Sequence, residues 1–207
     1  MSMDNKKKTI DLYKENMWVW IFTTIRFWTG SFSQLEEYVP KSGTIIDLGC
    51  GYGIFSNYLA LLSPKRAIIG VDTDKNKISH AFKNVTNTSF KAGDATKMKF
   101  KNVSGVIIHD VLHHLDSYEG QKNLVKDCRE MLKKGGVLLI VEVDKKPIGK
   151  WMLGRLADFV MYKGDPVRYR YRDDMSNMLL NYFHAKNISI KRLQSSPFAQ
   201  IAYICIK

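Results

Sequence analysis

The stretch "IIDLGCGYG", residues 45–53, constrains the fold more than any other part of the sequence. An apolar run reaches Asp47 and is then closed by Gly49, Gly51 and Gly53. Glycine adopts backbone angles closed to other residues, and without a β-carbon it lets a ligand lie against the main chain. The stretch is therefore typical of a buried strand followed by a ligand-binding turn.

The spacing of these glycines differs from the dinucleotide-binding fingerprint GxGxxG. The third glycine comes one place early, and the sixth position holds Ile54. This spacing disfavours a nicotinamide-dependent oxidoreductase. Asp47 would place a carboxylate in the same cleft, which suits a cationic or hydroxyl-bearing ligand better than a pyrophosphate.

Short apolar segments alternate with segments of helical periodicity along the chain. We expect strands at 43–49, 66–72, 88–96 (with a turn), 103–110, 137–144, 188–194 and 201–207. We expect helical segments at 13–39, 54–63, 74–84, 120–136, 151–161 and 175–184, the fourth stopped by a glycine pair. The pattern predicts one α/β domain with a doubly wound, seven-stranded, mostly parallel, Rossmann-like sheet and a C-terminal antiparallel hairpin strand.

Length and cysteine content agree with a single domain in a reducing compartment. The 207 residues are 45% hydrophobic, enough for one core. The three cysteines are isolated, so neither a disulfide framework nor a CxxC metal site is indicated. Residues 1–16 are too charged for a signal peptide and are expected to form a solvated, partly disordered leader. No window has the apolar length to span a bilayer, and the expected location is the cytoplasm, with peripheral membrane attachment left open.

Two further acids follow later strands. Asp72 ends the second strand, 25 residues after Asp47, near the offset at which an acid meets ribose hydroxyls in doubly wound nucleotide sites. Asp94 follows the third strand, where its carboxylate could accept from an adenine amino group. Three acids at the carboxyl ends of three successive strands predict a nucleoside-type site.

At this point the chain resembles the class I S-adenosylmethionine-dependent methyltransferases, in their small-molecule branch. The motifs are "IDLGCGYG", "GVDTD", "GDAT" and "VIIHDVLHHL", in order, within residues 43–144. The resemblance implies that S-adenosyl-L-methionine is the cofactor and S-adenosyl-L-homocysteine the product. It also implies a helical cap at 1–40, a cofactor-binding core at 41–144, an acceptor-side insertion at 145–185 and two final strands at 186–207.

The resemblance assigns the cofactor contacts by motif. Asp47 and the glycines would meet the methionine end, Asp72 the ribose, and Asp94 with Ala95 the adenine. The positive sulfonium explains why acids line the pocket. The full set of expected cofactor-binding residues is Asp47, Gly49, Cys50, Gly51, Gly53, Asp72, Thr73, Asp94, Ala95 and His109.

Methyl transfer to a hydroxyl or ammonium acceptor requires removal of a proton. The candidate bases are Asp110, His113 and His114, with His109 beside them, and His113 is the first choice. The alternative is that this segment only holds the cofactor and packs a helix. No Asn-Pro-Pro-Tyr stretch, which holds an amide or exocyclic amine in several nucleic-acid and protein methyltransferases, follows the fourth strand, and this leaves the small-molecule branch. No Asp-Asn pair of the kind that completes a magnesium site is present either, so no metal is expected.

Two apolar segments are expected to cover the cleft and form an apolar acceptor pocket: the helix 17–28 and the insertion 145–172. Their composition suggests an aromatic or lipid-like acceptor, presented freely, by an acidic carrier protein or at an anionic membrane surface. A cationic rim of Arg168, Arg170 and Arg172 is expected. The alternatives are that the aromatic residues are ordinary core and that the arginines pair with nearby aspartates.

The charge distribution leaves two other functions open. Residues 1–40 carry no net charge, 41–144 carry +4 and 145–207 carry +8. This basic excess, with the alternation "RYRYR", is the ground for RNA methylation as an alternative. The absence of an appended RNA-binding module or a continuous basic helix face disfavours a nucleic-acid partner. A non-catalytic cofactor-binding subunit is the second alternative.

Overall fold

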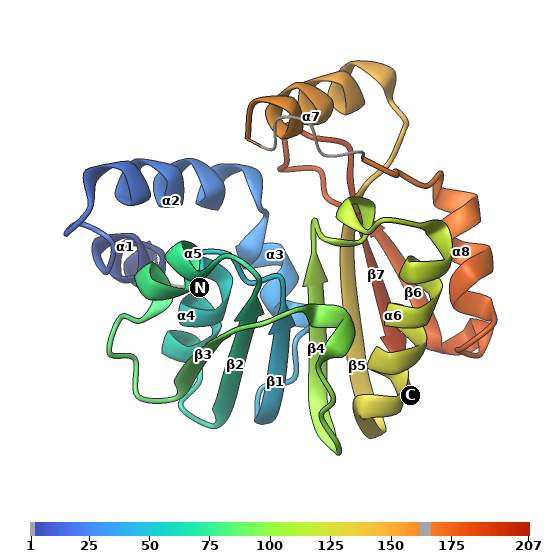
Figure 1. Cartoon of the computed structure of the whole chain (residues 1–207), viewed down its shortest axis with the longest axis horizontal. Helices are drawn as coiled ribbons and strands as arrows, with labels where there is room; N and C mark the ends of the chain where they lie inside the picture. Colours follow the sequence, from blue (N-terminus) through green and yellow to red (C-terminus); the bar gives the residue numbers. More distant parts are fainter. Residues whose placement is uncertain (1–2, 162–166) are drawn as a thin grey trace.

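The computed structural model describes residues 3–161 and 167–207 (Figure 1). Seven strands form one sheet in the order β3-β2-β1-β4-β5-β7-β6. The first five are parallel, and β7 pairs antiparallel with both β5 and β6. Their bounds are β1 Gly43–Leu48, β2 Arg66–Asp72, β3 Thr88–Ala92, β4 Val103–His109, β5 Leu132–Val143, β6 Ile188–Arg192 and β7 Gln200–Ile206. The predicted fold class, including the C-terminal hairpin, is confirmed.

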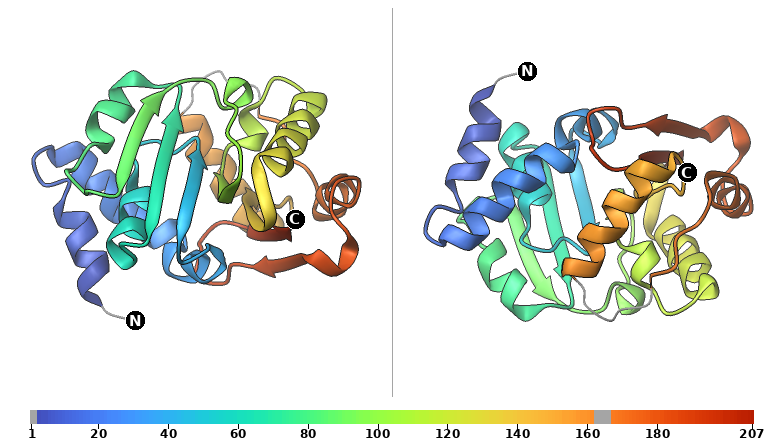
Figure 2. Two further views of the ribbon diagram at one scale, coloured as in Figure 1. Left: turned by 90° about the horizontal axis from the view of Figure 1, so that it is seen from below. Right: turned by 90° about the horizontal axis from the view of Figure 1, so that it is seen from above.

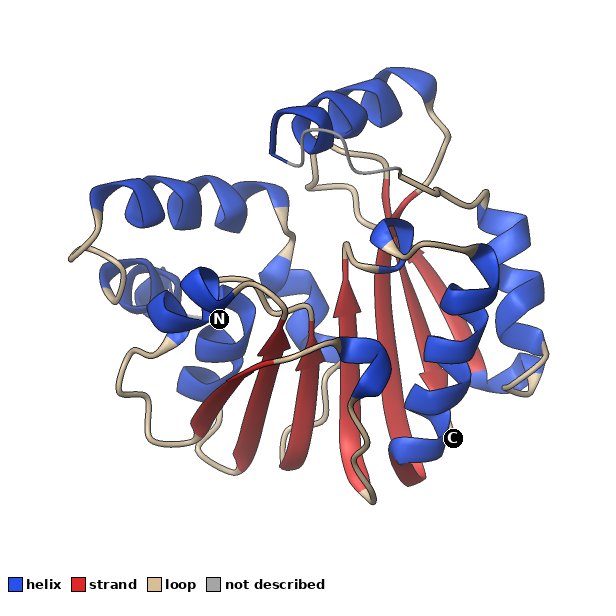
Figure 3. Cartoon of the chain, in the orientation of Figure 1, coloured by secondary structure: helices blue, strands red, loops and turns tan. Residues whose placement is uncertain are grey.

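Helices cover both faces of this sheet (Figure 3). The helices that pack on the faces of the sheet include α4 Ile54–Leu62, α5 Lys75–Ala81, α6 Tyr118–Met131 and α8 Arg172–Leu180. Short 3₁₀ turns lie at Glu36–Tyr38, Ala95–Lys97, Leu112–His114 and Ala185–Asn187. One apolar core joins α6 and α8 to the sheet, and a second joins α4 and the N-terminal helices to the opposite face. Coverage of both faces explains why the central strands are continuous apolar runs.

The chain reverses its winding direction between β1 and β4. Both strands lie side by side in parallel, and from β1 the chain proceeds outward to β2 and β3 before it returns to β4. The loops after these two strands therefore separate, which leaves a crevice at their carboxyl ends. The glycine turn and the segment after His109 both open onto this crevice.

Helices α2 Met17–Thr29 and α7 Ile148–Met161 belong to the two regions expected to cover the cleft, and the short helix α3 Phe32–Leu35 follows α2. Seen from above, α2 and α7 run across the carboxyl ends of the strands (Figure 2). Asn16 begins α2 because its side-chain oxygen accepts from the amides of Trp18 and Val19. None of the described helices combines the length and apolar character needed to cross a bilayer.

The expected leader is wrong for the described residues 3–16. Residues Met3–Asp11 form α1, and Tyr13, which follows it, is fully buried. The Tyr13 hydroxyl donates to the Tyr52 carbonyl (2.8 Å) and accepts from the Asn57 amide (2.8 Å). The lysine-rich composition concealed this anchor, because Thr9 and Tyr13 face inward while the lysines stay near the surface.

The end of the helix expected at 120–136 is also corrected. Helix α6 ends at Met131, and β5 begins at once with Leu132. The Gly135–Gly136 pair lies within β5, where the register against β4 shifts. Gly135 has a φ of +76° and donates to the Lys207 carbonyl (2.7 Å). The glycines therefore permit an irregular strand rather than cap a helix.

Candidate active site

A cavity of about 220 Å³ lies at the carboxyl ends of β1, β2 and β4, beneath α2 and α7. Its lining divides into three groups. One wall carries Asp47, Asp72 and the glycine turn; the middle carries His109, Asp110, His113 and His114. The remaining wall is apolar and includes Phe22, Ile25, Phe32, Phe55, Val143 and Phe198. The cavity thus joins an acidic end to an apolar end.

The three glycines of the turn differ in what surrounds them. All have positive φ, but a β-carbon at Gly49 would lie 2.2 Å from Val111, and one at Gly53 would lie 2.6 Å from the Phe90 ring. A β-carbon at Gly51 would meet nothing within 4 Å, and Gly51 lines the cavity. Gly49 and Gly53 are therefore required by packing inside the protein, whereas Gly51 keeps space open for a ligand.

Asp72 ties the glycine turn to β2. One oxygen of its carboxylate accepts from the Gly51 amide (2.7 Å), and the other accepts from the Asp74 amide (2.9 Å). A carboxylate has about four lone-pair directions, so two bonds to the backbone leave further acceptor positions. Asp72 can therefore hold the turn and accept from ribose hydroxyls.

Asp47 is the most deeply buried carboxylate of the cavity wall, at 3% exposure. The Ser56 hydroxyl donates to it (2.6 Å). Burial raises the pKa of Asp47 to about 6, the Ser56 hydrogen bond opposes this, and the negative charge of Asp72 adds to it. A cationic ligand in the cavity would stabilise the ionised form of Asp47 and would itself gain a counter-charge.

Asp110 connects three elements at the top of β4. Arg26 of α2 donates to its carboxylate at 2.7 Å, and the Gln200 amide of β7 donates at 2.9 Å. Burial raises the pKa of Asp110, but the charges of His109 and Arg26 outweigh it and bring the pKa to about 2. Asp110 is therefore ionised throughout the physiological range, and it is a weak base.

His109 lies beside this pair. Burial lowers its pKa to about 3, against the attraction of Asp110 and with the help of Arg26, so the ring is neutral at physiological pH. Its edge packs against the rings of Phe32 and Phe55. Its Nε2 lies 3.5 Å from an Asp110 oxygen, and within the described part of the chain it makes no hydrogen bond. A buried, unsatisfied nitrogen on the cavity wall fits contact with a ligand.

His113 is held by a carboxylate that the sequence analysis did not select. Its Nδ1 lies 2.5 Å from a Glu142 oxygen, and the other Glu142 oxygen accepts from the Val111 and Leu112 amides. The His113 ring also stacks on Tyr169, with centroids 4.9 Å apart. Glu142 carried a detectable signal, since it is an acid near the carboxyl end of an otherwise apolar strand.

Four predicted cofactor contacts lie outside the cavity lining: Gly53, Thr73, Asp94 and Ala95. Asp94 caps the turn Ala95–Lys97, because its carboxylate accepts from the Thr96 amide (2.9 Å) and hydroxyl (2.7 Å). These bonds hold the pKa of Asp94 below its usual range. An adenine contact by Asp94 and Ala95 stays a prediction. Cys50, by contrast, lines the cavity as expected, and burial raises the pKa of its thiol.

The expected cationic rim is not part of the cavity lining, which includes none of Arg168, Arg170 and Arg172. The Arg170 guanidinium donates to Gln121 (2.6 Å) and to the Tyr118 carbonyl (3.0 Å), and it lies over the Tyr118 ring. Arg168 donates through its backbone to the His113 carbonyl (2.7 Å). These residues fasten the chain after residue 167 to α6 and the loop before it. Asp165, one of the alternative partners, lies outside the described residues.

Two cations line the cavity, Arg26 of α2 and Lys77 of α5. Arg26 is the one charge in the apolar segment 17–29, and this isolation was the signal that could have identified it. Across residues 3–161 and 167–207, no group of three or more histidine, cysteine, aspartate or glutamate side chains has an arrangement that could hold a metal ion.

The chain is similar in sequence to several methyltransferases. A family model described as a methyltransferase domain matches residues 46–140. The demethylmenaquinone methyltransferase of Thermotoga maritima is 26% identical over 148 residues, 67% of this chain and 62% of that protein. The mitochondrial ubiquinone biosynthesis O-methyltransferase of Dictyostelium discoideum is 24% identical over 194 residues, 84% of this chain and 59% of that protein. The ribosomal RNA small subunit methyltransferase C of Shewanella sediminis is 30% identical over 131 residues, 59% of this chain and 38% of that protein.

Solved structures share the fold. The magnesium protoporphyrin IX methyltransferase of Synechocystis PCC 6803, solved with bound SAH, superposes with a TM-score of 0.63 at 17% identity, over 85% of this chain and 80% of that one. Fold and site define a doubly wound α/β protein with a crevice for a nucleoside-type ligand. Together with the matched domain, they make the chain similar to the class I S-adenosylmethionine-dependent methyltransferases and support that activity. The chain spans about three fifths of the length of the two quinone-methylating relatives.

The residues present fit the cofactor of this family. Asp47 and Asp72 supply negative charge for a sulfonium and an ammonium, Gly51 leaves its side open, and His109, whose Nε2 makes no hydrogen bond, lines the cavity. A pyrophosphate would meet two carboxylates and would be repelled. The acidic wall therefore agrees with S-adenosylmethionine and disagrees with a dinucleotide.

Proposed function

We propose that this protein transfers the methyl group of S-adenosylmethionine to a small apolar acceptor of aromatic or lipid-like character. The observation that carries the proposal is the division of one cavity between an acidic wall and an apolar wall. A cationic cofactor needs the acidic wall and an uncharged acceptor needs the apolar wall, and the two molecules must meet where these walls join.

In the cofactor half, the core 41–144 supplies the contacts. Asp47 would face the positive methionine end, and Asp72 would accept from the ribose hydroxyls while it holds Gly51. When bound, S-adenosylmethionine supplies a methyl group already activated by its sulfonium. The protein must then align the acceptor and exclude water, because the displacement is in line.

In the acceptor half, the cap 1–40 and the insertion 145–185 would select the substrate. Phe22 and Ile25 come from α2, Val143 from the end of β5 and Phe198 from the loop before β7. These groups offer an apolar surface without charge. One relative is named a demethylmenaquinone methyltransferase and another a ubiquinone biosynthesis O-methyltransferase, and these names support an aromatic acceptor with a long apolar part.

For a hydroxyl acceptor, His113 would take the proton. Glu142 holds Nδ1, so the neutral ring would carry its proton there and would use Nε2 as the base. The carboxylate would stabilise the imidazolium as the acceptor oxygen forms its bond to the methyl carbon and the carbon–sulfur bond breaks. Asp110 is less suited to this role, because a carboxylate with a pKa of about 2 takes up a proton poorly at neutral pH.

RNA methylation is the second candidate. A ribosomal RNA methyltransferase is among the relatives, and the chain carries a formal charge of +12. Against it, the cavity wall opposite the acids is apolar, and two of the arginines proposed to meet phosphates are engaged with α6 and its preceding loop. A non-catalytic subunit would bind the cofactor and show no turnover with any acceptor.

The test measures cofactor binding and turnover separately. Calorimetry with S-adenosylmethionine, S-adenosylhomocysteine and NAD should show binding of the first two alone. Turnover is followed as S-adenosylhomocysteine release with a hydroxylated aromatic acceptor bearing an apolar tail, with its tail-free analogue, and with ribosomal RNA. Turnover that prefers the tailed acceptor supports the proposal. Turnover with RNA alone would replace it, and binding without turnover on any acceptor would favour the non-catalytic subunit.

A further inference from the structure

Helix α2 presents an apolar side to solvent. Its inner side buries Val19, Thr23 and Phe27. Its outer side exposes Trp18 and Trp28, each at 76%, together with Met17, Ile21 and Ile25. Exposed tryptophans near the two ends of a short helix are unfavourable in water and are typical of a membrane–water interface.

Helix α7 also presents an apolar side to solvent. Its exposed apolar side chains are Ile148, Met152, Leu153, Leu156 and Phe159. With the five of α2, these residues make up what we call the α2–α7 face. Among the described residues, ten of the fifteen large apolar side chains that are exposed belong to it. Such clustering distinguishes a docking surface from the scattered apolar residues of an ordinary surface.

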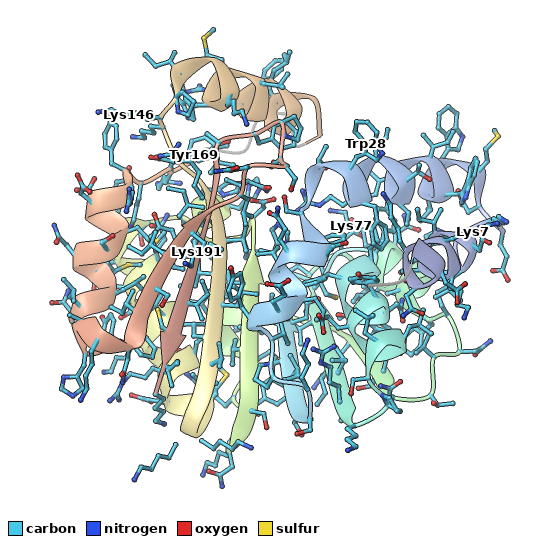
Figure 4. All side chains as sticks on the ribbon, turned by 180° about the vertical axis from the view of Figure 1, so that it is seen from behind. Lys7, Trp28, Lys77, Lys146, Tyr169 and Lys191 are labelled. Atoms are coloured by element: carbon cyan, nitrogen blue, oxygen red, sulfur yellow. The ribbon has the colours of Figure 1, made fainter. Side chains whose placement is uncertain are left out.

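The two helices lie on the same edge of the molecule, beyond the carboxyl ends of the strands (Figures 1 and 2). Seen from behind, Trp28 projects from the outer side of α2, and Lys146 lies at the start of α7 (Figure 4). Ile25 is both 56% exposed and part of the cavity lining, and Gly154 of α7 also lines the cavity. The apolar face and the cavity are therefore continuous.

The charges on this edge are mostly of one sign. The segment 17–29 contains no acidic residue, and the segment 145–161 contains one, Asp158, against four basic residues. Lys145, Lys146, Lys150 and Arg155 all belong to the second segment. Lysines and arginines beside an exposed apolar helix match the headgroups of anionic lipids, whereas a face that pairs with a second copy would bring these charges together.

We propose that the α2–α7 face docks on an anionic lipid bilayer and that the cavity receives its acceptor from that surface. The docking follows from the face itself, and the delivery of the acceptor rests on the function proposed above. The two helices would lie in the headgroup region with their apolar residues inserted and Lys146, just before α7, against phosphates.

The test is co-sedimentation of the full chain with vesicles of phosphatidylcholine alone and with about 30% phosphatidylglycerol added. We expect binding to the anionic vesicles at low salt, a loss of binding at high salt and a blue shift of tryptophan emission. The double substitution Trp18→Glu and Phe159→Glu should lower partitioning about tenfold or more. Lys146→Glu should lower it about fivefold. Leu180→Glu, on the exposed end of α8, is the matched control and should change nothing.

Three outcomes overturn the proposal: no binding to anionic vesicles by a folded protein, an equal loss with Leu180→Glu, or a dimer in sedimentation velocity that Trp18→Glu dissociates. Circular dichroism checks that each variant is folded. Turnover of a detergent-solubilised acceptor, measured without vesicles, separates the two proposals. Turnover without vesicle binding would support the proposed function and overturn the docking. Vesicle binding without turnover would support the docking and count against the proposed function.

Discussion

Arg26 of α2 and Asp110, the residue after β4, form an ion pair of 2.7 Å whose side chains are 22% and 18% exposed. This pair links the cap to the sheet on the wall of the cavity. It holds Asp110 in position with Gln200, and it places a cation between the acidic and the apolar ends. The position of the cap is thus set by an interaction between residues 84 apart in the chain.

The first prediction concerns this pair. Arg26→Ala should loosen α2 and speed hydrogen exchange of its amides, because the cap loses its contact with β4. A double-mutant cycle with Asp110→Ala should give a coupling of about 1–3 kcal/mol, the range for a partly buried charged hydrogen bond. Lys8→Ala, which removes an exposed ion pair with Asp4, is the control and should leave the exchange of α2 unchanged. Additive effects of the two cavity substitutions would show that the pair does not hold the cap.

The second prediction separates the three glycines. Gly51→Ala should fold with a loss of about 1–2 kcal/mol in stability, because an alanine is strained at this positive φ. It should bind S-adenosylhomocysteine weakly, because the new methyl group would occupy the open space that the ligand needs. Gly49→Ala should destabilise the fold far more, since its β-carbon would overlap Val111. Thermal denaturation and calorimetry measure the two effects. Normal binding by Gly51→Ala would remove the glycine turn from the site.

The third prediction is a pH dependence at Asp47. Its folded pKa of about 6 exceeds the ordinary 3.8, so the unliganded protein loses stability as pH rises from about 4 to 6. Asp47→Asn should therefore stabilise the unliganded protein at pH 7.5 by up to about 2–3 kcal/mol, with the gain disappearing near pH 4. The gain is measured as the difference in unfolding free energy at the two pH values.

The same residue should control cofactor affinity in the opposite sense. S-adenosylmethionine should bind more weakly below pH 6, where Asp47 takes up a proton and its charge is lost, and Asn at this position should remove the dependence. Calorimetry at pH 5.5 and 7.5 provides the measurement. An affinity that is flat with pH in the wild-type protein would place the sulfonium away from Asp47.

The fourth prediction concerns the base. His113→Ala should lower turnover of a hydroxyl acceptor by about 10²–10⁴-fold while S-adenosylhomocysteine affinity is kept. Glu142→Gln should act through His113: a Gln amide facing Nδ1 would favour the tautomer with its proton on Nε2, and turnover should fall about tenfold or more. The pH–rate profile should lose its acidic limb in His113→Ala. His184→Ala, on the surface, is the control. Lost cofactor affinity in His113→Ala would make the histidine a support of the pocket.

The fifth prediction tests the anchor of the N-terminal segment. Tyr13→Phe keeps the ring but removes the hydroxyl between Tyr52 and Asn57, and it should lower the free energy of unfolding by about 1–3 kcal/mol. Tyr171→Phe, at a half-exposed ring, should change it by less than about 0.5 kcal/mol. If Tyr13→Phe left the free energy of unfolding unchanged, residues 3–16 would be a loosely attached leader and not an anchored segment.

The sequence alone determined the order of the strands along the chain, the fold class and the acidic turn. Each depends on local patterns: apolar runs of strand length, alternation with helices, and glycines at the end of the first strand. These patterns suffice because a parallel sheet buried on both faces requires continuous apolar strands, and the crevice then follows from where the winding reverses.

Only the tertiary structure decided which residues meet. Glu142 reaches His113, Arg26 reaches Asp110, and Tyr13 reaches Asn57 across separations of 29, 84 and 44 residues. No local pattern encodes such contacts, because they depend on how helices and loops pack over the sheet. The roles of the glycines were also hidden, since Gly49, Gly51 and Gly53 look alike in the sequence and differ only in what a β-carbon would touch. The arginines after residue 167 are the reverse case. Their charge pattern suggested a cationic rim, but none of them lines the cavity, and Arg170 is bonded to Gln121 of α6 instead.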